Sequence, residues 1–295
     1  MTGAERGFLL LTSYLGDPAR KPLTASQFRE LTHRVKDMTS REQNRDVNAQ
    51  DFIAIGYKEV FARHIVELLR DEELLEYYLL QAKKADCYPI TRASECYPVA
   101  VRKCLELDSP GVLWAKGDVS ILNLPKVALV GSRDLQSDNA AFAREVGRQA
   151  AIQGYALVSG NARGADKIAQ NACLDAGGKV ISVVADSLLE HTKKENVLYL
   201  SENSFDEPFS AQRALSRNRV IHSLGQKVFV AQCGYQTGGT WDGTVKNLHF
   251  GWRPVFCFRD GSPAQKLLEE MGADSITGEQ LGDLSELRPA ISALF

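Results

Sequence analysis

Short apolar runs without polar alternation recur between residues 112 and 258. They lie at residues 112–114, 127–130, 156–158, 180–184, 197–200, 228–231 and 255–258. Amphipathic stretches alternate with them, at residues 139–153, 165–176, 213–224, 241–250 and 263–271. A strand that is apolar throughout is buried on both faces, and strand–helix alternation builds a parallel sheet. With right-handed crossovers, the pattern predicts an α/β fold with a doubly wound, Rossmann-like parallel sheet.

A different pattern fills residues 24–84, where apolar residues recur with the i, i+3, i+4 spacing of amphipathic helices. The stretch that follows contains two turn-prone pairs, Tyr88-Pro89 and Tyr97-Pro98. The predicted organisation is a small helical N-terminal domain (1–84), a connector (85–124), the Rossmann-like domain (125–282) and an acidic tail (283–295).

The composition is typical of a globular protein and excludes several other classes. Apolar residues make up 44% and charged residues 24% of the 295 residues. No run of 18 apolar residues occurs, and the N-terminus lacks the apolar core of a signal peptide. We therefore expect a cytoplasmic protein with no membrane segment, whose six cysteines stay as free thiols.

The charge distribution says more than the net charge of −2, which does not indicate a nucleic-acid partner. Residues 125–260 carry 16 basic and 13 acidic residues, whereas residues 261–295 carry 2 and 6. The middle of the chain is therefore mildly basic, which is compatible with an anion site there or with ordinary surface charge.

Four polar segments fall where doubly wound sheets bind ligands, beyond the carboxyl ends of the strands. Glycines in such loops leave backbone N–H groups free to face an anion, and the planar fork of arginine fits phosphate. The segments together predict a phosphate-lined groove. The candidate residues are Gly131, Ser132, Arg133, Ser159, Gly160, Arg163, Gly164, Lys167, Arg217, Asn218, Arg219, Gly239 and Thr240.

Each segment also has an ordinary structural interpretation. A glycine after a strand is commonly just a turn. Arg213 and Arg217 are predicted on one face of a single helix, with Arg219 pointing elsewhere, and form either an anion site or a solvated face. Asp166 is expected as a first-turn helix residue or as the partner of an arginine. The coincidence of four such segments at one sheet edge favours the anion site.

Motifs of other functions are missing from the sequence. It has no GxGxxG followed by a ribose-binding acidic residue, which disfavours NAD, and no GxxxxGK[ST], which excludes a P-loop ATPase. It has no GxSxG, and its five histidines and six cysteines lack metal-ligand spacing. We therefore predict no catalytic residue, no metal and no cofactor.

Several segments together resemble the DNA-processing protein A (DprA/Smf) family. They are Tyr97-Pro98 and residues 108–118, 127–133, 159–166 and 217–221, and the resemblance covers residues 85–275. It implies an extended Rossmann domain that binds single-stranded DNA and loads a RecA-type recombinase in natural transformation and DNA recombination. It also implies a homodimer that is not an enzyme. By motif it implies DNA contacts at Ser132, Arg133, Arg163, Lys167, Arg217, Asn218 and Arg219.

The chain departs from the family pattern at three points. It leaves no room for a C-terminal winged-helix domain, and Ala165 stands where the family has isoleucine. Residues 235–244 replace an expected Ser-Gly-Ser-rich turn. These departures favour a divergent member, for which a defence role is the alternative to DNA uptake.

Two further functions stay open as alternatives. The same superfamily includes lysine-decarboxylase-like nucleoside-monophosphate phosphoribohydrolases and sensors of nucleotide-derived ligands. The hydrolases carry a glutamate after a glycine-rich loop, whereas Asp242 here is out of register for it. This disfavours the glycosidase-type reaction. A phosphate cradle that holds one small ligand is equally compatible with a sensor.

Overall fold

The computed structural model describes residues 1–36 and 46–289, which form two compact units. Unit 1 comprises Met1–Tyr97 and Pro110–Leu113, and unit 2 comprises Pro98–Ser109 and the chain from Trp114 onward. Strand β2 (Val112–Lys116) therefore contributes residues to both units. Within the predicted acidic tail, residues 290–295 lie outside the described residues.

Unit 1 is mainly helical. Its elements are α1 (Gly3–Thr12), α2 (Ala25–Val35), α3 (Ala49–Ala54), α4 (Glu59–Arg70), α5 (Glu72–Lys84) and β1 (Tyr88–Thr91). Thr2 and Thr24 begin α1 and α2 with capping boxes, which satisfy backbone N–H groups at each helix start. Apolar faces meet in a core around Leu31, Phe52 and Ile65. The predicted turn at Tyr88-Pro89 is wrong: the pair lies in β1, an edge strand, where a residue without an N–H donor is tolerated.

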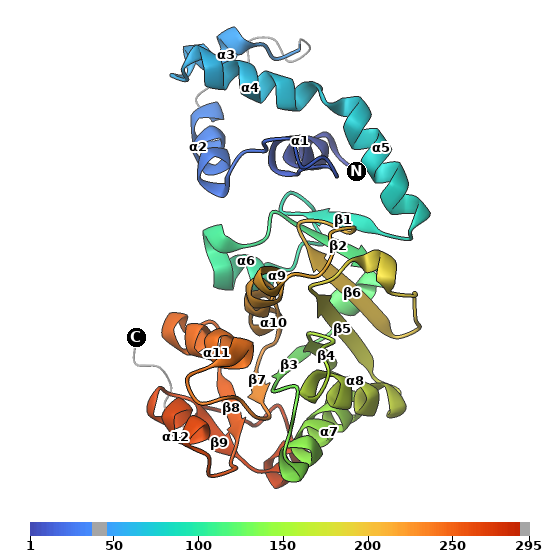
Figure 1. Ribbon diagram of the computed structural model, residues 1–295, viewed down its shortest axis with the longest axis vertical. Coiled ribbons are helices and arrows are strands. Elements are labelled where there is room, and N and C mark those ends of the chain that lie inside the picture. The colour runs from blue at the N-terminus through green and yellow to red at the C-terminus, as the bar shows by residue number, and fades with distance from the viewer. Residues whose placement is uncertain (37–45, 290–295) are drawn as a thin grey trace. The chain divides into compact units, whose positions relative to one another are not determined.

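Unit 2 is built on a mostly parallel sheet (Figure 1). After β2 come β3 (Lys126–Val130), β4 (Ala156–Ser159), β5 (Lys179–Val184), β6 (Val197–Glu202), β7 (Val228–Val230), β8 (Val255–Phe258) and β9 (Asp274–Ile276). The strand order in this unit is β2-β6-β5-β4-β3-β7-β8-β9, and all pairings from β6 to β9 are parallel. The predicted doubly wound α/β sheet is confirmed.

The sheet reverses its winding direction between β3 and β7. The chain moves outward from β3 through β4 and β5 to β6, and then returns to place β7 on the other side of β3. Ala128 is accordingly paired with Val158 on one side and with Val228 on the other. Loops that leave β3 and β7 run in opposite directions, so this switch point leaves a crevice at the carboxyl ends of the strands.

The helices of unit 2 flank the sheet. They are α6 (Val99–Leu105), α7 (Ser137–Ile152), α8 (Ala165–Asp175), α9 (Ala211–Ser216), α10 (Asn218–Leu224), α11 (Gly238–Phe250) and α12 (Pro263–Glu270). Short 3-10 segments lie at Glu106–Asp108, Val119–Asn123, Leu188–Glu190 and Gly278–Gly282. α7 and α8 pack on each other and on β3 and β4. α10 packs on the same two strands and on α11, and α11 packs on β8. Figure 1 shows the two pairs on opposite sides of the strands.

The predicted single helix over residues 213–224 is wrong. Arg217 ends α9 and begins α10, and the Val220 N–H bonds to the Arg217 carbonyl only three residues back. This tighter turn interrupts the α-helical ladder. The Arg217 N–H still donates to the Arg213 carbonyl at 2.9 Å, so these two residues are i, i+4 neighbours as predicted, and the interruption follows Arg217. Strand β9 is an element that the sequence pattern did not indicate.

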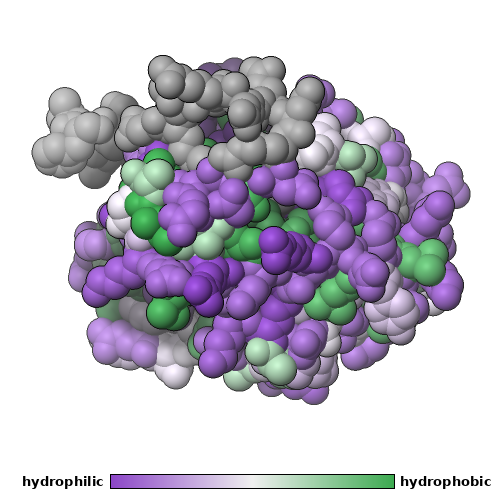
Figure 2. Space-filling view, turned by 90° about the horizontal axis from the view of Figure 1, so that it is seen from above, coloured by the Kyte–Doolittle hydropathy of each residue, from purple (hydrophilic) through white to green (hydrophobic). Residues whose placement is uncertain are grey.

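Among the described residues, no helix combines the length and the apolar character that crossing a bilayer requires. Hydrophilic residues dominate the face seen in Figure 2, and hydrophobic residues lie between them in small patches.

Candidate functional site

A cavity of about 610 Å³ opens at the switch point, beyond the carboxyl ends of β3 and β7. Its walls come from the β3–α7 loop, the β7–α11 loop and the α9–α10 segment, with contributions from the start of α8. Seven predicted phosphate-binding residues line it, namely Gly131, Ser132, Arg133, Arg217, Asn218, Gly239 and Thr240. The predicted binding residues in this hollow come from three of the four segments, and the fourth segment contributes Ala162 and Asp166 to its lining.

The β3–α7 loop presents Arg133 to this cavity. The loop is fixed by its backbone: the Ser132 N–H and hydroxyl both donate to the Gln232 carbonyl, at 2.9 and 3.2 Å, and the Ser132 carbonyl accepts from Ala165. The Arg133 side chain is exposed, and the described residues include no hydrogen-bond or ion-pair partner for its guanidinium. Arg133 is therefore available to an anion without first breaking an internal contact.

Arg217 is buried instead, with an exposed fraction of 8%. Its guanidinium lies so close to Gly160 that a Cβ at this glycine would overlap it. Burial lowers the pKa of Arg217, and the charges of Asp166 and Asp186 oppose that shift. The buried arginine and its acidic neighbours thus stabilise each other inside the fold, and Arg217 forms part of the cavity wall.

Asp166 occupies the first turn of α8, as predicted. Its Oδ2 accepts hydrogen bonds from the N–H groups of Gly160 and Ala162, at 3.1 and 3.2 Å. Burial raises the pKa of the Asp166 carboxyl, while Arg217 and the two N–H donors lower it. The carboxylate therefore holds the β4–α8 loop closed, and the loop N–H groups at Gly160 and Ala162 are not available to a ligand.

The glycine-rich β7–α11 loop forms the opposite wall. The Asn218 amide donates to the Gly239 carbonyl at 2.9 Å, which ties this loop to α10. Thr237 is the N-cap residue of α11 but makes no side-chain capping hydrogen bond. The first turn of α11 lines the cavity, and its backbone N–H groups therefore receive no hydrogen-bond acceptor from the Thr237 side chain.

Five predicted residues of the β4–α8 segment do not line the cavity, namely Gly160, which was described above, and four others. Ser159 is buried, and its hydroxyl accepts from Gln170 at 2.7 Å. Gly164 has φ +85°, and a Cβ there would overlap the carbonyl of Arg133, so its role is conformational. The remaining two are exposed cations with partners: Arg163 pairs with Asp134 at 2.9 Å, and Lys167 donates to Asn161.

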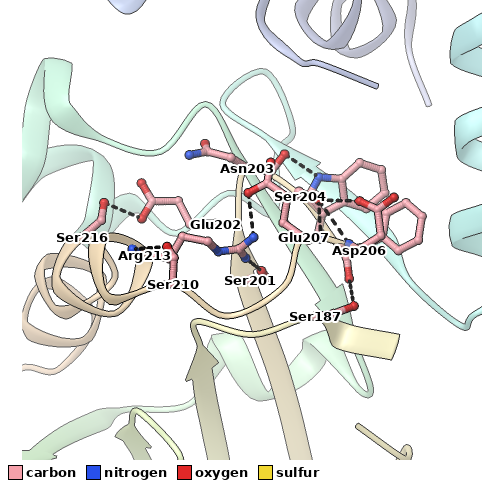
Figure 3. Close-up of polar contacts among 12 residues, drawn as sticks. Ser187, Ser201, Glu202, Asn203, Ser204, Asp206, Glu207, Ser210, Arg213 and Ser216 are labelled. Atoms are coloured by element: carbon pink, nitrogen blue, oxygen red, sulfur yellow. Dashed lines mark hydrogen bonds and ion pairs between the residues drawn. The ribbon is translucent and has the colours of Figure 1, made fainter. Parts of the chain in front are cut away.

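Arg219 also lies outside the cavity. Its guanidinium pairs with both carboxylate oxygens of Glu202 at the end of β6, and its Nε donates to the Asp108 carbonyl at 3.1 Å. Figure 3 shows the neighbouring contacts of Glu202 with Ser216, and of Arg213 with Ser201 and Glu207. Arg213 and Arg219 therefore join α9 and α10 to β6 and the loop that follows it.

Several cavity residues are absent from the sequence-based set. The apolar ones include Phe209 and Leu215, and the polar ones include Asp134 and His222. Phe209 and Leu215 sit beside the predicted arginines in the chain, but an apolar residue next to a helix start carries no signal of a ligand. His222 lies on the buried face of α10, and the sequence pattern there predicts a core residue and gives no sign of a ligand.

The charge inside the cavity is balanced: two arginines and two aspartates line it. Asp166 is satisfied by loop N–H groups and by Arg217, and Asp134 by Arg163. The attraction for an anion is therefore concentrated at Arg133. No group of three or more potential metal ligands is found among residues 1–36 and 46–289.

Asp242 pairs with Lys246 at 2.9 Å and is not a cavity-lining residue. The hydrolases carry an acidic residue after the glycine-rich loop, and Asp242 does not take that place in this protein.

The comparisons with known proteins assign the chain to a family. The family described as DNA recombination-mediator protein A matches residues 89–257, which is more than half of the chain. The chain belongs to this family. The predicted resemblance to the DprA/Smf proteins is thereby confirmed.

Curated relatives of this family member match about half of its length. DNA processing protein DprA of Streptococcus pneumoniae is 34% identical over 158 residues, which are 49% of this chain and 54% of that protein. DNA processing protein DprA of Bacillus subtilis is 29% identical over 176 residues, 56% of this chain and 58% of that protein. The chain spans about half the length of these relatives in the aligned regions.

Two solved structures share the fold. The X-ray structure of DprA from S. pneumoniae superposes with a TM-score of 0.73 at 24% identity, covering 98% of this chain and 99% of that one. A Helicobacter pylori DprA structure, described by its single-stranded DNA binding mode, gives a TM-score of 0.55 at 23% identity. It covers 66% of this chain and 93% of that one. At these identities, the likeness shows a common fold.

Proposed function

We propose that this member of the family binds single-stranded DNA in the cavity between β3 and β7. The observation that carries the proposal is the joint placement of Arg133 and Arg217 with two strand-end loops in one hollow. Arginine and loop contacts to phosphates give binding that tolerates sequence and weakens with salt. The names of the S. pneumoniae and H. pylori proteins, which refer to DNA processing and single-stranded DNA binding, support the same ligand.

The cellular setting is a finer proposal that rests on family membership. We place the protein in the cytoplasm, in DNA uptake and recombination, as a homodimer that passes single strands to a RecA-type recombinase. A defence role against foreign DNA is the alternative setting. We further propose that it acts by binding rather than by catalysis, because Asp134 and Asp166 are both engaged by donors inside the fold.

Fluorescence anisotropy with a labelled oligothymidylate tests the ligand. We expect the wild-type protein to bind the single strand more tightly than a duplex of equal length. Arg133→Ala removes an exposed cation and should weaken single-strand binding about tenfold. The matched control is Arg144→Ala, an exposed arginine on α7 outside this cavity. Equal affinity of wild type and Arg133→Ala would refute the site.

Nucleotide sensing is a second candidate function, which the size of the cavity favours. A volume of about 610 Å³ lies within the range of roughly 300–1,000 Å³ that small-molecule sites occupy. Calorimetry with AMP, ADP-ribose and a cyclic dinucleotide separates the two functions. Tight binding of one of these ligands without binding of the oligothymidylate would replace DNA binding by sensing. Release of free base from AMP would instead identify the hydrolase.

A further inference from the structure

Helix α9 differs from its neighbour α10 in how little of it is buried. None of the six residues of α9, Ala211–Ser216, is buried, whereas five of the seven residues of α10 are. The four residues before α9 form no regular secondary structure. A segment with few buried contacts separates from its surroundings at a low free-energy cost. α9 can therefore detach while the sheet and α10 stay folded.

This helix spans one side of the cavity. Its residues Ala211, Ala214 and Leu215 line the hollow, as does Phe209 just before it. The Leu215 side chain reaches the start of α11 on the opposite wall, where a Cβ at Gly239 would lie 3.3 Å from one of its methyl carbons. A ligand cannot cross this side of the cavity while α9 stays against α11.

A break in the helical backbone at Arg217 separates α9 from α10. The Val220 N–H bonds to the Arg217 carbonyl at 3.0 Å, so the hydrogen-bond ladder tightens directly after this residue. The Arg217 side chain is buried against Gly160 and stays with the body of the fold. Hinges are commonly a few residues at the ends of elements. The break therefore gives α9 a hinge at Arg217.

Polar contacts fasten α9 to β6 and to the loop that precedes the helix, as Figure 3 shows. Arg213 donates to the Glu207 carboxylate at 2.7 Å and to the Ser201 hydroxyl at 2.8 Å, and the Ser216 hydroxyl donates to Glu202 at 3.1 Å. The Glu207 side chain is 47% exposed, and ion pairs that water reaches contribute little to stability. The fastening is therefore weak enough to open and close repeatedly.

We propose that α9 is a strap that opens about Arg217 to admit the single strand and closes once the strand is in the cavity. This inference rests on the proposed binding of single-stranded DNA. An internal stretch of a long strand has no free end near the cavity, so it enters from the side, past α9. The closed strap then delays release, because the strand leaves by the same route.

A cross-link between α9 and α11 tests the strap directly. Leu215→Cys and Gly239→Cys place a thiol on each wall, and Cys96→Ser removes a native cysteine that is exposed. The probe is a circular oligothymidylate, because it has no end that can thread under a closed strap. We expect the oxidised protein to bind the circle more slowly than the reduced protein, by a factor on the order of ten. The reduced form of the same protein is the matched control.

Loading the DNA before oxidation should give the converse result. A circle that is bound first should stay on the protein after the disulfide forms, through a high-salt wash that strips it from the reduced protein. Salt weakens phosphate contacts but leaves a covalent closure intact. Mass spectrometry of the unreduced protein verifies the cross-link.

Two substitutions in the fastening need no cross-link and separate the strap from the effect of charge. Arg213→Gln and Glu207→Gln shift the net charge in opposite directions, but each breaks the same ion pair. Both should speed dissociation of oligothymidylate about threefold to fivefold, the factor for loss of one exposed pair. Lys246→Gln is the matched control, because it breaks an exposed pair with Asp242 outside the cavity and should leave the rate unchanged.

The outcomes distinguish this inference from the function on which it rests. Equal association of the circle with oxidised and reduced protein overturns the strap and leaves single-strand binding in place. Dissociation rates that stay unchanged, or that move in opposite directions in Arg213→Gln and Glu207→Gln, also overturn it. Absence of binding to the wild-type protein overturns the proposed function itself.

Discussion

Three arginines that look alike in the sequence have different roles in the fold. Arg133 is exposed without a partner, Arg217 is buried next to Asp166, and Arg219 is paired with Glu202. Only Arg133 can bind a ligand without first breaking a contact within the protein. The sequence could indicate that arginines gather at one sheet edge, but pairing and burial depend on residues far away in the chain, which no local pattern reveals.

Gly160 should be essential to the site although it does not line the cavity. A Cβ there would overlap the Arg217 guanidinium, which is buried and has little room to move. We expect Gly160→Ala to lower the free energy of unfolding by about 1–3 kcal/mol, the usual cost of overpacking, and to weaken single-strand binding. Urea unfolding and anisotropy measure the two effects.

Gly278→Ala is the control for this change, because a Cβ at Gly278 meets no atom within 4 Å. A Gly160→Ala protein with wild-type stability and wild-type affinity would mean that Arg217 is not held against Gly160.

His222 should make the protein sensitive to mild acid. Its pKa is about 3 when folded and 6.5 for the unperturbed group, so between these values only the unfolded chain binds the proton. The free energy of unfolding therefore falls as the pH decreases through this window, by about 2 kcal/mol from this group between pH 7.5 and 5. Urea unfolding at pH 7.5 and pH 5 measures this effect. The free energy of unfolding of His222→Phe should decrease between these pH values by about that amount less than the free energy of the wild type. Equal losses in the two proteins would contradict a buried neutral imidazole.

At the level of elements, the sheet was predictable because its signal is local. The buried strands of unit 2 are predicted by short apolar runs in the sequence. The helices that alternate with these runs predict that the strands are parallel. The break at Arg217 was not predictable, because residues 213–224 have helical periodicity throughout. The interruption follows Arg217, whose side chain lies against Gly160, a residue of another loop.

Arg219 is expected to act as a link between elements rather than as a DNA contact. It joins α10 to β6 through Glu202, whose side chain is only 8% exposed. Arg219→Ala leaves this buried carboxylate with the Ser216 hydroxyl but without its ion-pair partner, and should cost about 3 kcal/mol of unfolding free energy. Arg148→Ala, which breaks a more exposed pair with Glu145, should cost no more than about 1 kcal/mol. If Arg219→Ala keeps its stability and instead flattens the salt dependence of DNA binding, Arg219 is a phosphate contact.

At the level of the whole molecule, the chain carries a net charge of −2, so its overall field does not attract a polyanion. Affinity for a single strand must come from the few cations at the carboxyl edge of the sheet. Asp134 works against them, because it lines the cavity beside Arg133 and also holds Arg163 in an ion pair. A neutral residue at this position removes one repulsive charge and releases one arginine.

Asp134→Asn should therefore bind single-stranded DNA more tightly than the wild type. The exposed pair itself is worth no more than about 1 kcal/mol, so its loss should barely change stability and should improve affinity up to roughly fivefold. The released Arg163 should also steepen the decrease of log affinity with log salt by about 0.7, the value for one added single-strand phosphate contact. Anisotropy titrations across a salt series measure both quantities. Weaker binding by Asp134→Asn would mean that Asp134 itself contacts the ligand or positions Arg163. The phosphates of the bound strand would then not lie against this side of the cavity.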